Sequence, residues 1–155
     1  MSRTFSKTAW ALSGLLCLTF WSKASLAQDT SWKTNSAAGL AAYNQGKYAE
    51  AERLWLTALK EAEGFGPEDP RLATSLNNLA LLYSAQGKYA EAEPLYRRSL
   101  AIKQKALGPE HPDVATALEN YSALLRKTNR EAEAEKMEAR AKAIRAKHAQ
   151  QNPTH

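Results

Sequence analysis

The chain has 155 residues, of which 44% are hydrophobic, with 21 basic and 16 acidic side chains and a formal charge of +5. This length and balance are typical of a single globular domain and exclude wholesale disorder. The single cysteine excludes an internal disulfide framework and a multi-cysteine zinc site.

The first 27 residues have the pattern of a secretory signal peptide. A basic start precedes an uncharged run over residues 9–22, which is too short to cross a bilayer as a helix but suits the apolar part of a leader. Ser25 and Ala27 are small residues at the two positions that a signal peptidase reads. We therefore expect cleavage after Ala27, with Gln28 first in the mature chain. A retained membrane anchor is the alternative.

Removal of this leader changes the charge of the protein. The leader carries Arg3, Lys7 and Lys23 and no acidic residue, so the mature chain has 18 basic and 16 acidic side chains, a net charge of +2. The compositional argument for a nucleic-acid partner is thereby lost. Lipidation at Cys17 is disfavoured because the preceding residue is the large Leu16. The expected location is periplasmic or secreted, without stable membrane insertion after cleavage.

The rest of the chain repeats itself. The octapeptide QGKYAEAE at 45–52 recurs unchanged at 86–93, and a degraded copy begins at Thr128. The pentapeptide GPEDP at 66–70 recurs as GPEHP at 108–112. Repeat periods of about 20–50 residues predict stacked units, each unable to bury its own apolar face.

Each unit has the pattern of two helices joined by a tight turn. Apolar residues spaced by three and four mark the helical faces, and no alternating strand pattern occurs. Gly46 and Gly87, and Asn129 in the third unit, stand where such a turn requires a positive φ. Pro70 and Pro112 suit the first turn of a helix. The predicted helices cover residues 31–44, 48–63, 70–86, 89–106, 112–127 and 130–149.

These features resemble the tetratricopeptide repeat, in the 42-residue variant of kinesin light chains and many bacterial repeat proteins. Small residues lie where the paired helices approach closely, at Gly39, Ala80 and Ser122. The second helix carries its aromatic residue at Trp55 and Tyr96, which Glu138 replaces in the third unit.

The resemblance implies an all-α solenoid, a right-handed superhelix of three helix-turn-helix units. The units are expected at about 32–69, 70–111 and 112–149, within a domain over 28–155 whose last residues, 150–155, form a disordered tail.

The resemblance also implies where a partner binds. In this family the first helix of each pair lines a concave groove, and the groove positions fall on Tyr43, Asn44, Thr74, Asn77, Asn78, Leu81, Ser84, Thr116, Glu119, Asn120, Ala123, Arg126 and Lys127. Asn78 and Asn120 are equivalent, and an amide side chain can pair with the backbone of an extended peptide. The alternative is that each amide is solvated or bonds within its own helix.

One binding mode of the family is excluded. Some of its co-chaperones clamp a C-terminal carboxylate with lysine, arginine and asparagine side chains. Only Asn78 fits that pattern, since Ser36, Leu40, Thr116 and Asn120 occupy the other four positions and provide no cation.

No catalytic pattern accompanies the repeats. The chain has no nucleophile–base pair and no glycine-rich phosphate loop, and its three histidines lack metal-ligand spacing. We therefore expect a non-enzymatic adaptor that uses no cofactor and no metal and binds a protein or peptide. The alternative is a self-assembling, homo-oligomeric subunit of an envelope complex.

Overall fold

The computed structural model describes the backbone of residues 11–151 and the side chains of residues 26–151. Residues 1–10 of the expected leader and 152–155 of the expected tail lie outside the described part. Within it, every regular element is an α-helix: α1 (Ala11–Asn44), α2 (Tyr48–Glu63), α3 (Pro70–Ala85), α4 (Tyr89–Leu107), α5 (Pro112–Lys127) and α6 (Glu131–Gln151). None of these described helices is both long enough and apolar enough to cross a membrane.

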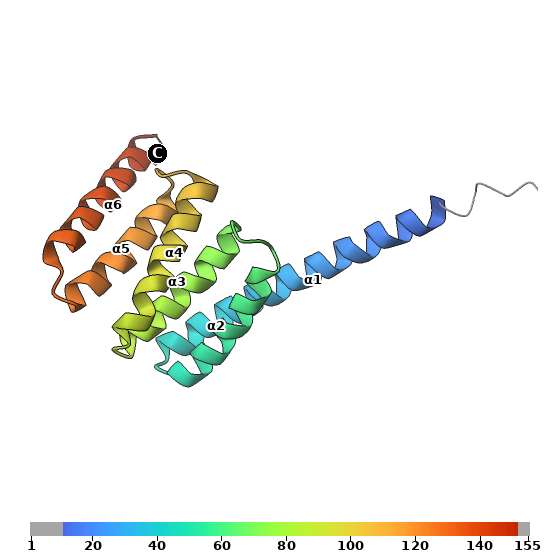
Figure 1. Cartoon of the computed structure of the whole chain (residues 1–155), viewed down its shortest axis with the longest axis horizontal. Helices are drawn as coiled ribbons and strands as arrows, with labels where there is room; N and C mark the ends of the chain where they lie inside the picture. The colour runs from blue at the N-terminus through green and yellow to red at the C-terminus, as the bar shows by residue number, and fades with distance from the viewer. Residues whose placement is uncertain (1–10, 152–155) are drawn as a thin grey trace, which may run out of the picture.

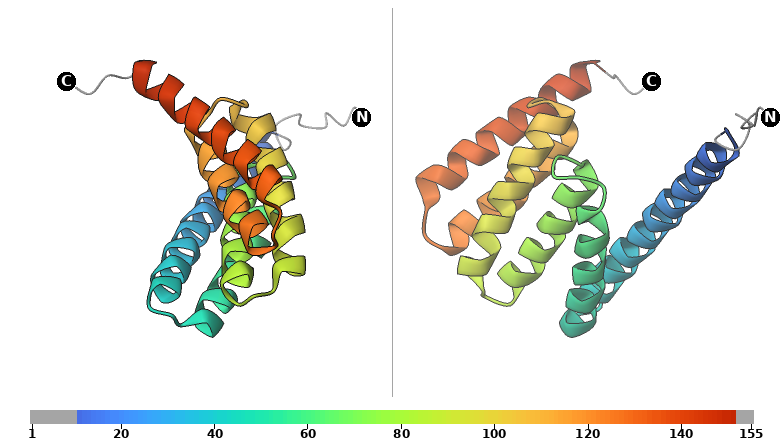
Figure 2. Two further views of the ribbon diagram at one scale, coloured as in Figure 1. Left: turned by 90° about the vertical axis from the view of Figure 1, so that its left-hand side faces the viewer. Right: turned by 45° about the vertical axis from the view of Figure 1, so that its right-hand side comes forward.

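The helices form three antiparallel hairpins that stack side by side (Figure 1). α1 pairs with α2, α3 with α4 and α5 with α6, while α2 packs on α3 and α4 on α5. α3 also contacts α1 and α5, so the first helices of the hairpins form one layer and the second helices form the other (Figure 2). The predicted all-α repeat array is confirmed.

Four of the six helices agree with the sequence prediction to within one residue at each end, but α1 and α6 are longer. α1 begins at Ala11 and not at residue 31. The added stretch contains no proline, so nothing in it breaks a helix. Its first half runs away from the other helices (Figure 1). α6 ends at Gln151, so Gln150 and Gln151 are helical and do not belong to a disordered tail.

The three turns inside the hairpins have one geometry. Gly46 and Gly87 have φ values of 73° and 76°, and Asn129 has a φ of 57°. In each turn the amide of the next residue donates to the carbonyl five residues earlier, at 2.9, 2.8 and 2.9 Å. This is the hydrogen bond that ends a helix at a left-handed residue. The prediction that asparagine replaces glycine in the third turn is confirmed.

In the first two hairpins, a large side chain of the second helix packs against a small residue of the first. Trp55 of α2 is fully buried, and its indole N–H donates to the carbonyl of Ser36 at 3.1 Å. A Cβ placed on Gly39 would lie 2.5 Å from Cδ1 of Trp55, so only glycine fits there. In the second hairpin the smaller Tyr96 accompanies Ala80, and both are buried.

We predict that Gly39→Ala lowers stability. Alanine gains up to about 1 kcal/mol of helix propensity over glycine, but overlap with a buried ring costs about 1–3 kcal/mol. Adding Trp55→Tyr, which reproduces the pairing of Ala80 with Tyr96, should recover part of the loss. Urea unfolding of the single and double variants measures both effects. A single variant as stable as the wild type would show that the indole moves aside without cost.

Candidate binding site

The first helices of the hairpins place equivalent residues in a row. Offsets of 41 and then 42 residues align Leu40 of α1 with Leu81 of α3 and Ala123 of α5. Leu40 is 48% exposed, Leu81 is half-buried and Ala123 is exposed. The layer formed by α1, α3 and α5 therefore carries an apolar row that crosses all three units.

A hollow of about 180 Å³ opens beside this row, between α3 and α5. Buried Tyr96 of α4 lies at its base, and α1 contributes one aromatic side chain. The lining residues are Tyr43, Leu81, Ser84, Ala85, Tyr96, Asn120, Ala123, Leu124 and Lys127. Six of these are predicted groove residues: Tyr43, Leu81, Ser84, Asn120, Ala123 and Lys127. The walls are mainly apolar and aromatic, with one amide and one ammonium group, so the hollow suits a side chain of a bound peptide.

Tyr43 is held at the hollow by its aromatic neighbours. Its ring centroid lies 5.6 Å from that of Tyr48 and 5.6 Å from that of Trp55. Burial is the main reason why the pKa of its hydroxyl is raised. The pKa of the Tyr96 hydroxyl is raised to about 12, again mainly by burial. Both hydroxyls therefore stay protonated and neutral at physiological pH.

An amide bridge joins α3 to α5. The side-chain amide of Asn120 donates to Oδ1 of Asn77 at 3.2 Å. Asn77 is nearly buried, at 8% exposed, and Asn120 is half-buried. The sequence pairs Asn120 with Asn78 by repeat register, whereas the hydrogen bond runs to Asn77. One donor of Asn120 is therefore used inside the array, at the wall of the hollow.

The other predicted residues on α1 and α3 lie outside the hollow. Asn78 is half-buried and shares the register of Asn120. Thr74 donates its hydroxyl to the carbonyl of Pro70 at 3.0 Å, within its own helix. Asn44 is exposed at the last residue of α1.

Three predicted groove residues of α5 are engaged by α6. Arg145 forms a two-pronged pair with Glu119, with both N–O distances 2.6 Å, and also donates to the hydroxyl of Thr116 at 3.1 Å. Arg126 forms a similar pair with Glu138, with both distances 2.8 Å. Hydrogen bonding to Arg145 lowers the pKa of the Glu119 carboxyl. Thr116, Glu119 and Arg126 therefore fasten the last helix and do not line the hollow.

Sequence reasoning missed one residue of the apolar row and three residues that line the hollow. Leu40 belongs to the apolar row, and its offset of 41 residues from Leu81 was a signal that could have identified it. Tyr96, Ala85 and Leu124 also line the hollow. Tyr96 reads as a core aromatic in the sequence, and only the packing of α4 beneath α3 and α5 brings it to the base of the hollow.

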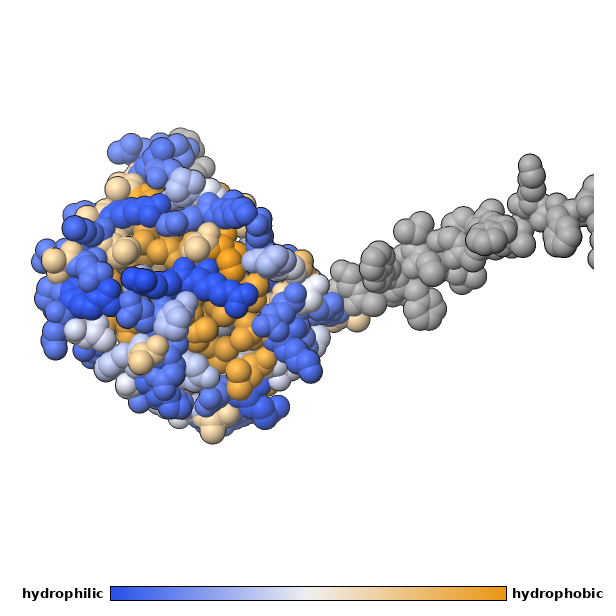
Figure 3. Space-filling view, in the orientation of Figure 1, coloured by the Kyte–Doolittle hydropathy of each residue, from blue (hydrophilic) through white to orange (hydrophobic). Residues whose placement is uncertain are grey.

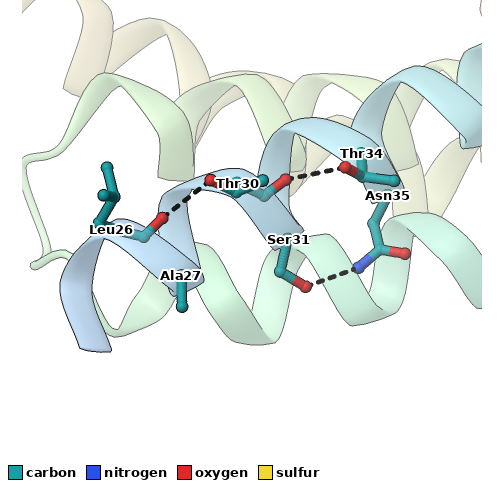
Figure 4. A pocket seen from close by; sticks show the side chains of 6 residues that line it. All are labelled: Leu26, Ala27, Thr30, Ser31, Thr34 and Asn35. Atoms are coloured by element: carbon teal, nitrogen blue, oxygen red, sulfur yellow. Dashed lines mark hydrogen bonds between the residues drawn. The ribbon is translucent and has the colours of Figure 1, made fainter. Parts of the chain in front are cut away.

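A larger hollow of about 610 Å³ lies along α1, and Figure 4 shows its six lining side chains. They are Leu26, Ala27, Thr30, Ser31, Thr34 and Asn35. The hydroxyls of Thr30 and Thr34 donate to carbonyls one turn earlier, at 3.0 and 2.9 Å. All six residues belong to one helix and span the predicted cleavage point. This hollow has no opposing wall among the described side chains, so we assign it no role.

Figure 3 shows one face of the array, on which patches of apolar side chains lie between charged and polar ones. Leu56 of α2 is a large apolar residue that is 46% exposed, close to the 48% of Leu40. Leu40 and Leu56 are therefore nearly equally exposed leucines, one in the apolar row and one on a second helix, and can be compared by substitution.

A cluster centred on Arg71 ties the start of the array together. Its guanidinium donates to both oxygens of Asp69, at 2.9 and 2.7 Å, and to Asp29 of α1 at 2.7 Å. The same group lies 3.4 Å from the centroid of the Phe65 ring. The Arg71 bonds are the main reason why the pKa of the Asp69 carboxyl is lowered. For Asp29 the pKa is lowered first by Lys33 and then by Arg71.

The carboxyls with a lowered pKa have structural partners. Over the described side chains, no group of three or more histidine, cysteine, aspartate or glutamate residues could hold a metal ion. The carboxyls with lowered pKa are all bonded to arginine or lysine partners, as ion pairs that join helices or helix turns.

The comparisons agree with this architecture. Residues 72–113 match the family model described as tetratricopeptide repeat. Among solved structures, the chain resembles BtubC (BKLC) from P. vanneervenii, with 25% identity and a TM-score of 0.68 over 80% of this chain and 50% of that one. It also resembles the nearly identical TPR-like repeats of a kinesin light chain from Podosopora anserina, with 25% identity and a TM-score of 0.68 over 75% of this chain and 56% of that one.

This chain thus spans about half the length of those structures. No curated protein matches it. The comparisons support a tetratricopeptide-repeat protein, with a fold that generally mediates protein–protein interaction, and indicate no enzymatic family and no nucleic-acid partner.

We predict that the Arg71 cluster makes stability depend on acid pH. The pKa of Asp69 is lower in the folded protein than its unfolded value of about 3.9. The stabilisation is therefore fully present above about pH 4 and is lost as the pH falls through the folded pKa. Arg71→Met should lower the melting temperature near neutral pH and flatten its fall between about pH 5 and pH 2.

The matched control is Arg53→Met, which removes an exposed arginine of α2. It should leave the pH profile unchanged, because Arg53 is not a partner of any carboxyl whose pKa is lowered. If Arg71→Met and the wild type lose stability in parallel as the pH falls, the cluster does not contribute to acid sensitivity.

Proposed function

We propose that the protein is a non-catalytic interaction module that binds an extended protein or peptide segment on the layer formed by α1, α3 and α5. The observation that carries this proposal is the hollow between α3 and α5, next to the apolar row of Leu40, Leu81 and Ala123. The hollow takes a side chain of the peptide. The amide of Asn120 lines the hollow and that of Asn78 lies one turn before Leu81 on α3, so both are available to the peptide backbone. A preformed surface of this kind reduces the ordering entropy that binding costs.

We further propose that the module is exported and acts in the periplasm or outside the cell after cleavage behind Ala27. The leader pattern in the sequence motivates this step, and the contacts of the next residues support it. The side-chain amide of Gln28 donates to the carbonyl of Glu61 at 2.7 Å, and Asp29 pairs with Arg71 at 2.7 Å. Leu26, by contrast, is 68% exposed. Cleavage at this point would keep both of these contacts.

The binding proposal is tested with an array of random decapeptides probed with the mature protein. Leu40→Glu should reduce the number of bound peptides several-fold, because binding of an apolar side chain to the row would then desolvate a carboxylate. Leu56→Glu is the matched control, with the same substitution at nearly the same exposure on a second helix. Equal binding by the wild type and both variants would remove the assignment of the groove.

The export proposal is tested by expressing the whole chain in a bacterium and measuring the mass of the product. The expected N-terminal residue is Gln28, in the periplasmic or secreted fraction. Ala27→Leu places a large residue at the cleavage position and should leave the leader attached, whereas Ala24→Leu, at a position that the peptidase does not read, should be processed normally. A wild-type product that keeps Met1 would refute cleavage.

A further inference from the structure

Gln28, the residue that cleavage behind Ala27 would place first, occupies a capping position of the repeat. Offsets of 41 and then 42 residues align Gln28 with Asp69 and His111. These two residues are the N-caps of α3 and α5, and each side chain accepts a hydrogen bond from an amide of the first turn that follows. The proposed mature chain would therefore begin at the capping position of its first unit.

The side chain of Gln28 reaches across to α2. Its amide donates to the backbone carbonyl of Glu61, in the last turn of α2, at 2.7 Å, and the residue is half-buried. Ser31 and Asn35, further along α1, donate to the carboxylate of the same glutamate at 2.5 and 3.2 Å. The start of the proposed mature α1 is thus fastened to the end of α2.

Gly64 provides the space for the amide of Gln28. It directly follows α2, and its φ of −69° and ψ of −17° lie in the right-handed helical region that any residue adopts. The backbone therefore does not require glycine there. A Cβ on Gly64, however, would lie 2.2 Å from Nε2 of Gln28 and 3.3 Å from its Cδ. Gly64 and the carbonyl of Glu61 form a notch that holds this amide, and a side chain at position 64 would exclude it.

An N-terminal glutamine can react with itself. Its free α-amine attacks Cδ of its own side chain, so that an N–Cδ bond forms and the Cδ–Nε2 bond breaks. Nε2 leaves as ammonia with the proton that the amine gives up, and the product is pyroglutamate. The attack requires the two reacting atoms to approach within about 3–3.5 Å. Axes of packed helices lie about 8–10 Å apart, so a side chain that is bonded to the neighbouring helix extends away from its own amine.

We propose that the notch at Gly64 protects Gln28 of the mature protein from cyclisation to pyroglutamate. The proposal rests on the cleavage proposed above, because only a free α-amine can react. Cyclisation proceeds from the undocked side chain, so docking slows it by the ratio of docked to undocked molecules. One intramolecular hydrogen bond makes this ratio about fivefold. Protection also preserves the contact itself, because the ammonia lost on cyclisation contains the nitrogen that donates to Glu61.

The experiment follows the exported product, with Gln28 first, during incubation near neutral pH. The mass of its N-terminal peptide reports the loss of one ammonia. The folded wild type should cyclise about fivefold more slowly than the same protein in a concentration of urea that unfolds it. Folded Gly64→Ala should cyclise at nearly the rate measured in urea, because the added methyl group excludes Nε2 from the notch.

The matched control is Glu63→Ala, which changes an exposed residue next to the notch and leaves Gly64 in place. It should keep the slow cyclisation of the folded wild type. Gly64→Ala should melt near the wild-type temperature, because alanine accepts the helical backbone of position 64 and only the flexible end of Gln28 has to move. In urea all three proteins should cyclise at one rate, since the reacting residue is the same.

The outcomes separate this proposal from the export proposal. A product that keeps Met1 contradicts cleavage and overturns both. If the product begins at Gln28, cleavage is supported, and the rates then decide on the notch alone. Protection by the notch is overturned if the folded wild type cyclises as fast as in urea, a comparison that does not depend on any variant. It is also overturned if folded Gly64→Ala cyclises no faster than the wild type.

Discussion

The close approach of the two helices within each hairpin sets the rest of the structure. A large side chain of the second helix fits a small residue of the first, and the sizes change together from unit to unit. Trp55 accompanies Gly39, where no Cβ fits, and the smaller Tyr96 accompanies Ala80. Because interiors are close-packed, each pairing fixes how far apart its helices lie. The fit of Tyr96 against Ala80 thereby sets how closely α4 approaches α3, and Tyr96 is the residue of α4 that lines the hollow.

The third unit departs from this rule, and the departure explains its charges. Glu138 stands where Trp55 and Tyr96 stand in the other units, so no aromatic ring joins α6 to α5. Arg126 pairs with Glu138 in its place, and Arg145 pairs with Glu119 about two turns away along the same two helices. The side chains of these pairs are exposed to solvent, and ion pairs of this kind contribute little to stability. The buried Ala134, Ala141 and Ile144 provide the apolar part of the α5–α6 contact. The outer edge of the third unit is thereby polar and satisfied, unlike the aromatic contact of Tyr96 with Tyr121 that joins the second unit to the third.

The sequence predicts the helices and turns well because local signals determine them. The φ values of Gly46, Gly87 and Asn129 follow from residue type, and the bounds of α2 to α5 follow from periodicity and the two prolines. The predicted start of α1 was wrong because the apolar composition of a leader also suits a helix. No proline lies between Ala11 and residue 31 to end that helix. The Asn77–Asn120 bond and the engagement of Glu119 with Arg145 were not predictable from register alone. Repeat register says which residues are equivalent, but it does not say which neighbour a side chain contacts.

Three equivalent positions, Ala62, Lys103 and Arg145, illustrate this limit. A comparison of the units by residue type would treat the lysine and the arginine as similar. Their surroundings differ, because Arg145 is half-exposed and pairs with Glu119, whereas most of Lys103 is buried in the packing of α4 and burial lowers its pKa. Residues of similar charge at one register position can therefore differ in burial and in partner, and the contacts between units decide which of them is free to meet a ligand.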